Sequence, residues 1–126
     1  MMNKIILILV LVLSFACNSQ TNDNVKTINA NELKKIIEEG KVICLLDVRT
    51  KNEYDKGHIK NAKLIDYFSH DFINNCEKYL DKNKPIYVYC KSGGRSKKAS
   101  KILSDIGFTK IYDLQGGYLS WQKENQ

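Results

Sequence analysis

Residues 85–107 read PIYVYCKSGGRSKKASKILSDIG and are the most informative part of the chain for the fold class. Residues 86–89 form a short, continuous apolar and aromatic run, which is typical of a strand buried on both faces. Residues 96–106 have the apolar spacing of a helix and are followed by Gly107, a residue type that commonly ends helices. Because parallel sheets are built from a buried strand, a loop and a helix in succession, the sequence predicts an α/β fold.

Short apolar runs and helical patterns alternate on both sides of this stretch, which predicts repeated βα units and a mainly parallel sheet. The predicted strands are residues 27–28, 42–46, 62–65, 86–89 and 110–114. The predicted helices are residues 29–39, 52–56, 68–80 and 96–106, followed by a short closing helix that contains Trp121. Because the run 42–46 is apolar throughout, we expect that strand near the centre of the sheet.

The size and composition of the chain indicate one globular domain. With 126 residues the chain is long enough for one compact core and too short for two ordinary domains. Hydrophobic residues make up 43% and charged residues 27%, which excludes a disordered or collagen-like protein. The net charge is +6, but acidic residues accompany the basic ones along most of the chain. The sequence therefore does not favour a nucleic-acid partner, which needs basic residues gathered on one face.

The first residues have the organisation of a bacterial secretion signal. Lys4 precedes an apolar run, residues 5–13, that is too short to span a bilayer. A small residue and then Cys17 follow, an order that resembles a bacterial lipoprotein signal, although Ser14 stands where such signals usually have leucine. The resemblance implies a signal peptide over residues 1–16, a lipidated Cys17, a polar tether over residues 17–25 and a folded domain over residues 26–126.

The location of the protein depends on how this segment is processed. An ordinary cleaved signal peptide and an uncleaved hydrophobic anchor are the alternatives to lipidation. All three place the domain outside the cytoplasm. With lipidation we expect a monomer anchored to a membrane of the cell envelope and facing the periplasm, and with ordinary cleavage a secreted protein.

The predicted domain contains three cysteines, Cys44, Cys76 and Cys90. An odd number cannot pair completely within the chain, so at least one thiol stays free or pairs elsewhere. Cys44 lies in a predicted buried strand and Cys76 on the apolar face of a predicted helix, so we expect both in the core. The sequence has neither a C-x-x-C pair nor cysteine and histidine at metal-ligand spacing, and it gives no support for a metal site.

Cys90 begins a loop that has the composition of an anion-binding site. The loop, residues 90–96, reads CKSGGRS and joins the carboxyl end of a buried strand to a helix, where open α/β sheets bind their ligands. Gly93 and Gly94 allow positive φ angles, so that successive backbone N–H groups curl around one anion. Around Cys90, the residues expected to bind the substrate are Lys91, Ser92, Gly93, Gly94, Arg95 and Ser96.

This setting is expected to make the Cys90 thiol acidic. The amino end of the following helix has a partial positive charge, and Lys91 and Arg95 add two full ones. Cysteine thiols in such settings have pKa values of roughly 3.5 to 7.5, against about 8.5 for a free thiol. Arg95 or Lys91 can also hold an anionic group of a substrate. The alternative interpretation is an ordinary buried cysteine beside a glycine turn.

Three segments of the chain together resemble the rhodanese-like domain family. Residues 46–59, LDVRTKNEYDKGHI, resemble its amino-terminal signature. Residues 90–96 resemble its active-site loop, and residues 114–121, LQGGYLSW, resemble its carboxyl-terminal signature. The resemblance covers residues 27–121, nearly all of the predicted domain.

The resemblance implies a fold and a reaction. The fold is a three-layer α/β arrangement, with a five-stranded, mainly parallel sheet and helices on both faces. The reaction is sulfur transfer without a metal or organic cofactor: Cys90 takes a sulfur atom from a donor such as thiosulfate and passes it, as a persulfide, to cyanide or a thiol. Two alternatives stay open, a non-catalytic module that binds a partner with the same loop and an envelope redox protein in which Cys90 is oxidised.

Loop length separates this chemistry from that of phosphatases with a related fold, whose loop is one residue longer and has its arginine six positions after the cysteine. Here Arg95 stands five positions after Cys90, and Ser96 occupies the sixth. The shorter loop suits a sulfur atom better than a phosphoryl group.

Four other residues are expected to support the loop rather than to react. Asp47 ends a predicted strand, where it can accept hydrogen bonds from the loop or a neighbouring turn. Arg49 and Glu53 are four positions apart and can form an ion pair across a helical turn. His58 stands in the Gly-His-Ile segment, for which the resemblance implies a turn-stabilising role rather than proton transfer.

Overall fold

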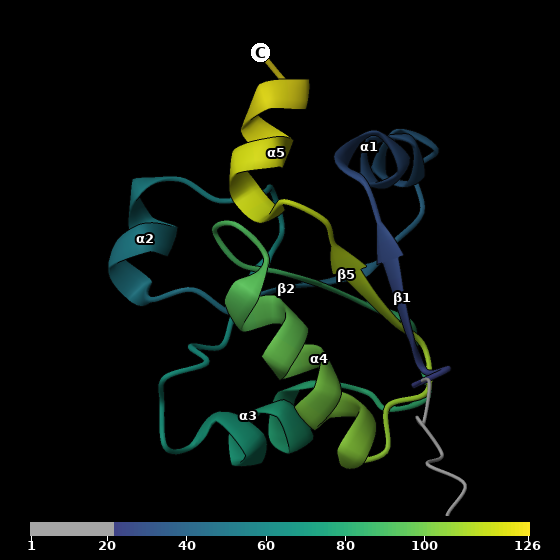
Figure 1. Ribbon diagram of the computed structural model, residues 1–126, viewed down its shortest axis with the longest axis vertical. Helices are drawn as coiled ribbons and strands as arrows, with labels where there is room; N and C mark the ends of the chain where they lie inside the picture. Colours follow the sequence, from purple (N-terminus) through teal and green to yellow (C-terminus); the bar gives the residue numbers. More distant parts are fainter. Residues whose placement is uncertain (1–21) are drawn as a thin grey trace, which may run out of the picture.

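A five-stranded sheet forms the middle layer of the computed structural model, which describes residues 22–126 (Figure 1). Its strands are β1 (Val25–Ile28), β2 (Cys44–Asp47), β3 (Lys63–Leu64), β4 (Ile86–Tyr89) and β5 (Ile111–Leu114). They lie in the order β1-β5-β4-β2-β3, and every pairing is parallel. The predicted α/β fold is confirmed, and β4, which leads to Cys90, is the central strand.

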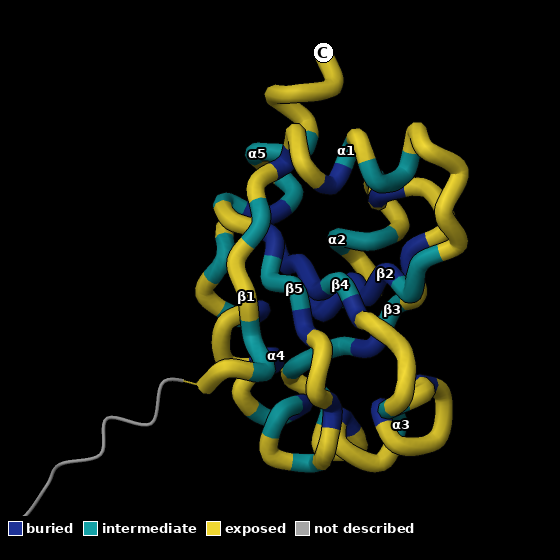
Figure 2. Tube along the Cα trace, turned by 90° about the vertical axis from the view of Figure 1, so that its right-hand side faces the viewer, coloured by how far each residue is buried: buried dark blue, intermediate teal, exposed yellow. Residues whose placement is uncertain are grey.

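Helices cover both faces of the sheet, as predicted. They are α1 (Ala30–Glu38), α2 (Lys51–Lys56), α3 (Phe72–Tyr79), α4 (Gly94–Asp105) and α5 (Gly117–Glu124). On one face α3 and α4 contribute Phe72 and Leu103 to an apolar cluster with the sheet. On the other face α1, α2 and α5 contribute Leu33, Tyr54 and Trp121 to a second cluster. Figure 2 shows buried residues concentrated along β2, β4 and β5, between these helical layers.

Two helices begin where the sequence provides side chains to cap them. Asn29 precedes α1 and accepts a hydrogen bond from the Glu32 N–H (2.8 Å), while the Glu32 carboxylate accepts one from the Asn29 N–H (3.4 Å). Thr50 and Glu53 form the same reciprocal pair at the start of α2, with both distances 3.3 Å. Such capping boxes satisfy N–H groups that the first helical turn leaves unpaired. In α2 the cap also places Arg49 outside the helix.

The helix predicted over residues 68–80 is shorter in the structure, where α3 begins at Phe72. The preceding residues form turns instead. The Asp66 side chain accepts the Phe68 N–H (2.8 Å), and the Ser69 side chain accepts a second backbone N–H (3.2 Å). Short polar side chains that bond to the nearby backbone in this way compete with helix formation.

The chain enters the fold beside the end of α4. Asn22 Oδ1 accepts a hydrogen bond from Ser104 Oγ (2.9 Å), and Asn24 Nδ2 donates another to the same hydroxyl oxygen (3.0 Å). β1 then begins at Val25, one residue before the domain start predicted from the sequence. The predicted signal peptide, the lipidation of Cys17 and the resulting location concern residues outside the described range and stay predictions. Within residues 22–126, no helix has the length and apolar character needed to cross a bilayer.

Candidate active site

The loop after β4 lies at the carboxyl edge of the sheet, at its centre. Cys90 directly follows β4, and α4 begins at Gly94. Gly93 has φ 116°, in the left-handed region that favours glycine, and its N–H donates to Cys90 Sγ over 3.1 Å. Gly94 has no positive φ angle, because it is already the first residue of the helix.

The Cys90 sulfur is buried under this loop, among hydrogen-bonding groups. The residue is 1% exposed, and its thiol lies 3.5 Å from Ser96 Oγ. The Ser96 hydroxyl in turn donates to the Gly93 carbonyl over 3.2 Å. When the thiol loses its proton, rotation of this hydroxyl lets it donate to the sulfur instead. The loop therefore provides an N–H and a hydroxyl for a single sulfur atom.

The pKa of Cys90 is lowered from the ordinary value of a thiol. Burial by itself raises it, because the thiolate loses the stabilisation of water. Hydrogen bonds from the Ser96 hydroxyl and from the backbone N–H groups of Ser96, Gly93 and Ser92 outweigh that penalty. The lowered pKa of Cys90 agrees with the acidity expected from the sequence. Its causes differ from the expected ones, because these hydrogen bonds lower the pKa more than the charges of nearby side chains do.

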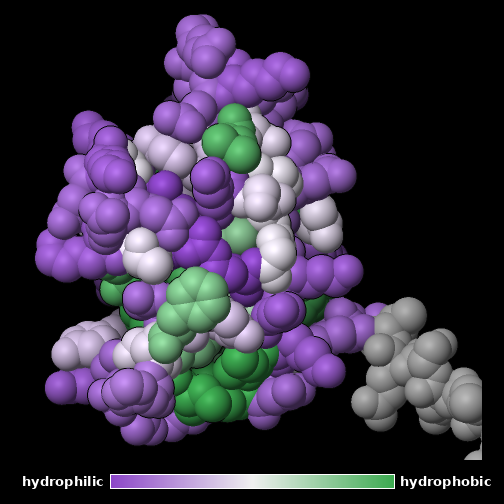
Figure 3. Space-filling model, turned by 60° about the vertical axis from the view of Figure 1, so that its left-hand side comes forward, coloured by the Kyte–Doolittle hydropathy of each residue, from purple (hydrophilic) through white to green (hydrophobic). Residues whose placement is uncertain are grey.

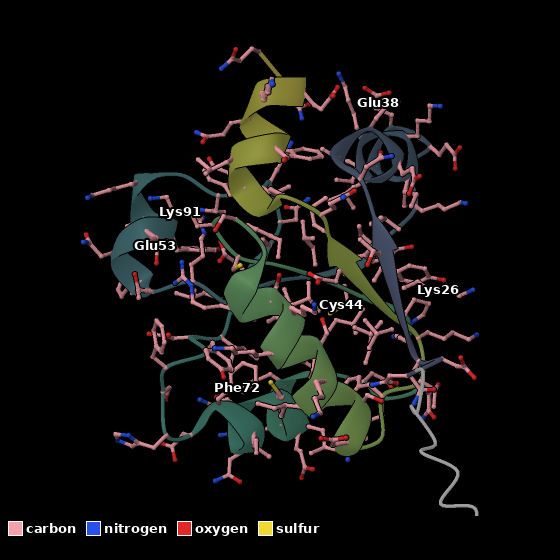
Figure 4. The ribbon with its side chains drawn as sticks, in the orientation of Figure 1. Lys26, Glu38, Cys44, Glu53, Phe72 and Lys91 are labelled. Atoms are coloured by element: carbon pink, nitrogen blue, oxygen red, sulfur yellow. The ribbon has the colours of Figure 1, made fainter. Side chains whose placement is uncertain are left out.

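Arg95 is held by Glu53 of α2 and is not free beside the sulfur. Its Nη1 and Nη2 donate to the two carboxylate oxygens of Glu53 over 2.7 and 2.9 Å (Figure 4, where Glu53 and Lys91 are labelled). Hydrogen bonding to Arg95 lowers the pKa of Glu53 to about 2. The prediction that Arg49 and Glu53 form an ion pair is wrong. The N-cap of α2 is Thr50, so Arg49 lies before the helix and not one turn from Glu53.

Arg49 instead pairs with Asp47 and connects β2 to the elements around the loop. Its Nη2 lies 2.7 Å from Asp47 Oδ2 and donates to the Gly57 carbonyl over 2.7 Å, and both side chains of the ion pair are almost fully buried. Its guanidinium also stacks on the Tyr118 ring, 4.3 Å from the centroid. Asp47 and Arg49 thus hold the ends of β2 and α2 against α5, which is a supporting position.

The start of α5 fixes the loop through backbone hydrogen bonds. The Tyr118 N–H donates to the Cys90 carbonyl (2.8 Å), and the Leu119 N–H donates to the Lys91 carbonyl (3.1 Å). Gly117 makes this approach possible, because an added Cβ would lie only 2.7 Å from the carbonyl carbon and oxygen of Lys91. This role of Gly117 depends on a contact between distant segments, so the residues around it do not reveal it.

The other predicted site residues lie at the surface. His58 is exposed, its ring stacks on Tyr54 with centroids 3.6 Å apart, and its Nδ1 lies 2.9 Å from the Tyr54 carbonyl oxygen. These contacts suit a turn-stabilising residue. Lys91 and Ser92 are exposed on the loop. In the described part of the chain, no three histidine, cysteine, aspartate or glutamate side chains gather to hold a metal ion.

The two other cysteines of the domain lie outside the site. Cys76 is fully buried in α3, as predicted, and burial raises its pKa to about 12. Cys44 is less buried than predicted, and burial still raises its pKa. Both are free thiols, as is Cys90. Among the three thiols that the structure describes, Cys90 alone is made more acidic.

One pattern in the sequence argues against an ion pair between Arg49 and Glu53. Thr50 and Glu53 have the T-x-x-E spacing of a capping box, which predicts a helix that begins at residue 51. With Arg49 outside that helix, the rule for ion pairs one turn apart no longer applies. The true partner, Arg95, is 42 residues away, and no local spacing identifies it.

We expect Glu53→Gln to destabilise the domain by about 2 kcal/mol near pH 7, because a neutral amide cannot replace two charge-assisted hydrogen bonds to Arg95. The folded-state pKa of Glu53 is about 2, against an ordinary value of 4.5. A lowered pKa contributes stability above pH 4.5, and this contribution is lost as the pH falls toward 2. Urea unfolding at about pH 7 and about pH 3 should therefore show a smaller acid-induced loss in the variant than in the unmodified protein.

Glu77→Gln is the matched control for this change. Glu77 pairs with Lys82 at the surface, where 48% of the glutamate side chain is exposed. Exposed pairs contribute roughly 0 to 1 kcal/mol, so the control should stay close to the unmodified protein at both pH values. An acid-induced loss in Glu53→Gln equal to that of the unmodified protein would contradict the role of the Glu53–Arg95 pair.

Known proteins are similar to this chain in sequence and in fold. The profile of the rhodanese-like domain family matches residues 29–124. Thiosulfate sulfurtransferase 18 of Arabidopsis thaliana is 30% identical over 115 residues, which cover 82% of this chain and 83% of that protein. The probable adenylyltransferase/sulfurtransferase MoeZ of Mycobacterium tuberculosis is 35% identical over 102 residues, which cover 79% of this chain.

The solved structures agree with the sequence comparison. The crystal structure of a rhodanese-like domain protein from Staphylococcus aureus superposes with a TM-score of 0.69 at 35% identity, over 76% of this chain and 90% of that one. MoeZ is a much longer protein, and the match spans 25% of its length. The family profile, by contrast, covers nearly all of the described residues. The chain therefore belongs to the rhodanese-like domain family.

Proposed function

We propose that the protein is a sulfurtransferase that moves sulfane sulfur from a donor such as thiosulfate to cyanide or a thiol, through a persulfide on Cys90. Relatives named sulfurtransferases support the general class of reaction, which needs a sulfur donor and an acceptor. The observation that carries the proposal is the Cys90 sulfur, a thiol of lowered pKa that faces the Gly93 N–H and the Ser96 hydroxyl.

The proposed cycle transfers one sulfur atom from donor to acceptor and needs no external oxidant or reductant. The Cys90 thiolate attacks the outer sulfur of thiosulfate, and the bond within the donor breaks so that sulfite leaves with the electron pair. The negative charge then resides on the terminal sulfur of the persulfide, in a loop whose donors favour an anion. Cyanide or a thiolate attacks that terminal sulfur, takes it as thiocyanate or a new persulfide, and restores the Cys90 thiolate.

The position of the sulfur restricts the donors that fit. Because Cys90 is 1% exposed, a terminal sulfur atom reaches it more easily than the enclosed sulfur of a disulfide. Arg95 is engaged by Glu53, whereas Lys91 is exposed and takes part in none of the ion pairs of residues 22–126. Lys91 is therefore the better candidate to attract an anionic donor. The surface on the α2 side is largely hydrophilic, which suits such a donor (Figure 3).

Intact-mass measurement after incubation with thiosulfate tests the proposal. The reduced protein should gain one sulfur atom and should lose it on treatment with cyanide, with release of thiocyanate. Cys90→Ser should gain nothing, whereas Cys44→Ser should behave as the unmodified protein because the Cys44 thiol has a raised pKa. Failure of the reduced protein to gain sulfur would overturn the proposal in favour of a binding module or a thiol redox protein.

A further inference from the structure

Arg95 adds a charged group to the loop directly beside the residues that contact the Cys90 sulfur. The hydroxyl of its neighbour Ser96 lies 3.5 Å from Cys90 Sγ, and the Gly93 N–H donates to the same sulfur over 3.1 Å. The pKa of Arg95 is raised, first by its hydrogen bonds to Glu53 and further by the charge of Cys90. An anionic donor that reaches the sulfur therefore encounters the state of charge of Arg95.

Glu53 occupies the edge of the guanidinium with which an arginine binds oxyanions. Nη1 and Nη2 of Arg95 each donate to one oxygen of the Glu53 carboxylate, over 2.7 and 2.9 Å. Arginine binds carboxylates and other oxyanions in the same paired arrangement. The pKa of Glu53 is about 2, so its carboxylate is charged throughout the neutral pH range. The pair has no net charge, and a doubly charged donor has to compete with Glu53 for the same N–H groups.

An aromatic ring lies over the same guanidinium. The centroid of the Phe68 ring is 5.6 Å from Arg95 Cζ, and 66% of Phe68 is exposed. The Asp66 side chain accepts the Phe68 N–H over 2.8 Å, and the Tyr67 ring packs against the Phe68 ring with centroids 5.6 Å apart. The backbone and the ring are thus both held in place. An exposed ring beside the loop offers a flat apolar contact to an organic group.

We propose that Glu53 and Phe68 set the donor specificity at Cys90, so that the site favours a singly charged donor with an organic group, an organic thiosulfonate or persulfide, over the doubly charged thiosulfate ion. Glu53 is a positioning residue that acts through Arg95, whereas Phe68 contacts the organic group. This choice of donor rests on the proposed function, but the charge balance beside the sulfur does not.

The chemical step with a thiosulfonate has the same balance as the step with thiosulfate. The Cys90 thiolate attacks the terminal sulfur, the sulfur–sulfur bond of the donor breaks, and a sulfinate leaves with the electron pair. The thiolate and a thiosulfonate together have two negative charges, whereas the thiolate and thiosulfate have three. Bringing the thiosulfonate to the sulfur therefore depends less on a free arginine.

The charge beside the sulfur is tested with iodoacetate and iodoacetamide, two alkylating reagents of similar size that differ by one negative charge. Peptide mass mapping gives the rate of modification at Cys90 itself. In the unmodified protein the ratio of the iodoacetate rate to the iodoacetamide rate should change less than about twofold between low and high salt, because a neutral pair leaves little charge to screen. A much stronger salt dependence would overturn the role of Glu53 without the need for any variant.

Glu53→Gln leaves the charge of Arg95 uncompensated. The ratio of the two rates at low salt should then rise about three- to tenfold, because the field of one cation favours the anionic reagent. Asp55→Asn is the matched control: it removes a carboxylate from the same helix, α2, but one that pairs with the exposed Lys51. This control should keep the original ratio. An unchanged ratio in Glu53→Gln would contradict the neutralisation of Arg95.

Steady-state sulfur transfer to cyanide, measured with thiosulfate and with the singly charged benzenethiosulfonate, tests the choice of donor. Glu53→Gln should lower KM for thiosulfate about three- to tenfold relative to KM for benzenethiosulfonate, with kcat values within about twofold of the original. Phe68→Ala should raise KM for benzenethiosulfonate about two- to tenfold and leave that for thiosulfate unchanged. Ile73→Ala, which shortens another exposed apolar side chain (45% exposed), should alter neither value.

The outcomes distinguish the donor specificity from the proposed function. If both donors form a persulfide on Cys90 but their KM values respond equally to Glu53→Gln and to Phe68→Ala, the donor specificity is rejected and the sulfurtransferase function stands. If neither donor forms a persulfide, the sulfurtransferase function is rejected, and the donor specificity with it. The two alkylation rates still decide in that case whether Glu53 neutralises Arg95.

Discussion

Replacing Arg49 by methionine is expected to lower the free energy of unfolding by about 3 to 5 kcal/mol. The Asp47 carboxylate is 0% exposed and accepts side-chain hydrogen bonds from Arg49 at distances of 2.7 to 3.1 Å. Methionine fills the space of the arginine stem but leaves a buried negative charge without its partner, which is the costly way to break such a pair. Urea unfolding followed by circular dichroism measures the loss, which is a large share of the roughly 5 to 15 kcal/mol that stabilises an ordinary domain.

Two further variants test whether the unpaired Asp47 carboxylate causes this loss of stability. Lys51→Met removes a cation that is 79% exposed and pairs with Asp55, so it should cost no more than about 1 kcal/mol. Asp47→Asn, added to Arg49→Met, neutralises the buried carboxylate and should recover part of the lost stability. The proposed role of the pair fails if the double variant recovers nothing, or if Arg49→Met costs as little as the surface control.

The centre of the fold is predictable because its signals lie in neighbouring residues. The predicted strand over residues 86–89 coincides with β4, and the helix predicted over residues 96–106 becomes α4, which starts two residues earlier at Gly94. An apolar run, a glycine turn and a helical pattern all occur within this one stretch. They are sufficient to predict the parallel sheet and the position of the Cys90 loop.

The ends of elements depend on contacts that the sequence does not display. The strand predicted over residues 42–46 begins only at Cys44, which is where it finds Ile86 as its partner in β4. Val42 precedes that pairing and is fully exposed, although it belongs to the same apolar run. An apolar run therefore favours a strand, whereas the neighbouring strand sets where it begins.

The candidate site likewise combines residues of one short segment with residues that are distant in the sequence. The sulfur atom and the donors around it come from residues 90–96, so their chemistry follows from one short segment. The groups that orient the loop come from elsewhere: Glu53 reaches Arg95 from α2, and Gly117 brings α5 against the loop. Only the fold brings such residues together, so the sequence predicts the loop itself but not the partner of Arg95 or the contact made by Gly117.

Gly117→Ala is expected to remove most of the reactivity of Cys90 and to lower the free energy of unfolding by about 3 kcal/mol. Gly117 has φ 58°, where an alanine is strained, and the added Cβ would lie 2.7 Å from the carbonyl carbon and oxygen of Lys91. Either the loop or α5 must move. That movement disrupts the hydrogen bonds that Tyr118 and Leu119 donate to the loop carbonyls, and it displaces the N–H groups that face the sulfur. Loss of one charge-assisted hydrogen bond to the thiolate should slow iodoacetamide alkylation at about pH 7 by roughly tenfold or more.

Gly40→Ala separates backbone strain from collision with the loop. Gly40 has φ 74°, close to that of Gly117, but a Cβ there would meet nothing within 4 Å. It should therefore lose only the roughly 1 to 2 kcal/mol of a strained backbone and should keep the original alkylation rate. Strain is common to the two glycines, whereas contact with the carbonyl groups of the loop is special to Gly117. If Gly117→Ala also kept that rate, the sulfur would hold its position without α5, and the backbone hydrogen bonds between α5 and the loop would have no part in the acidity of Cys90.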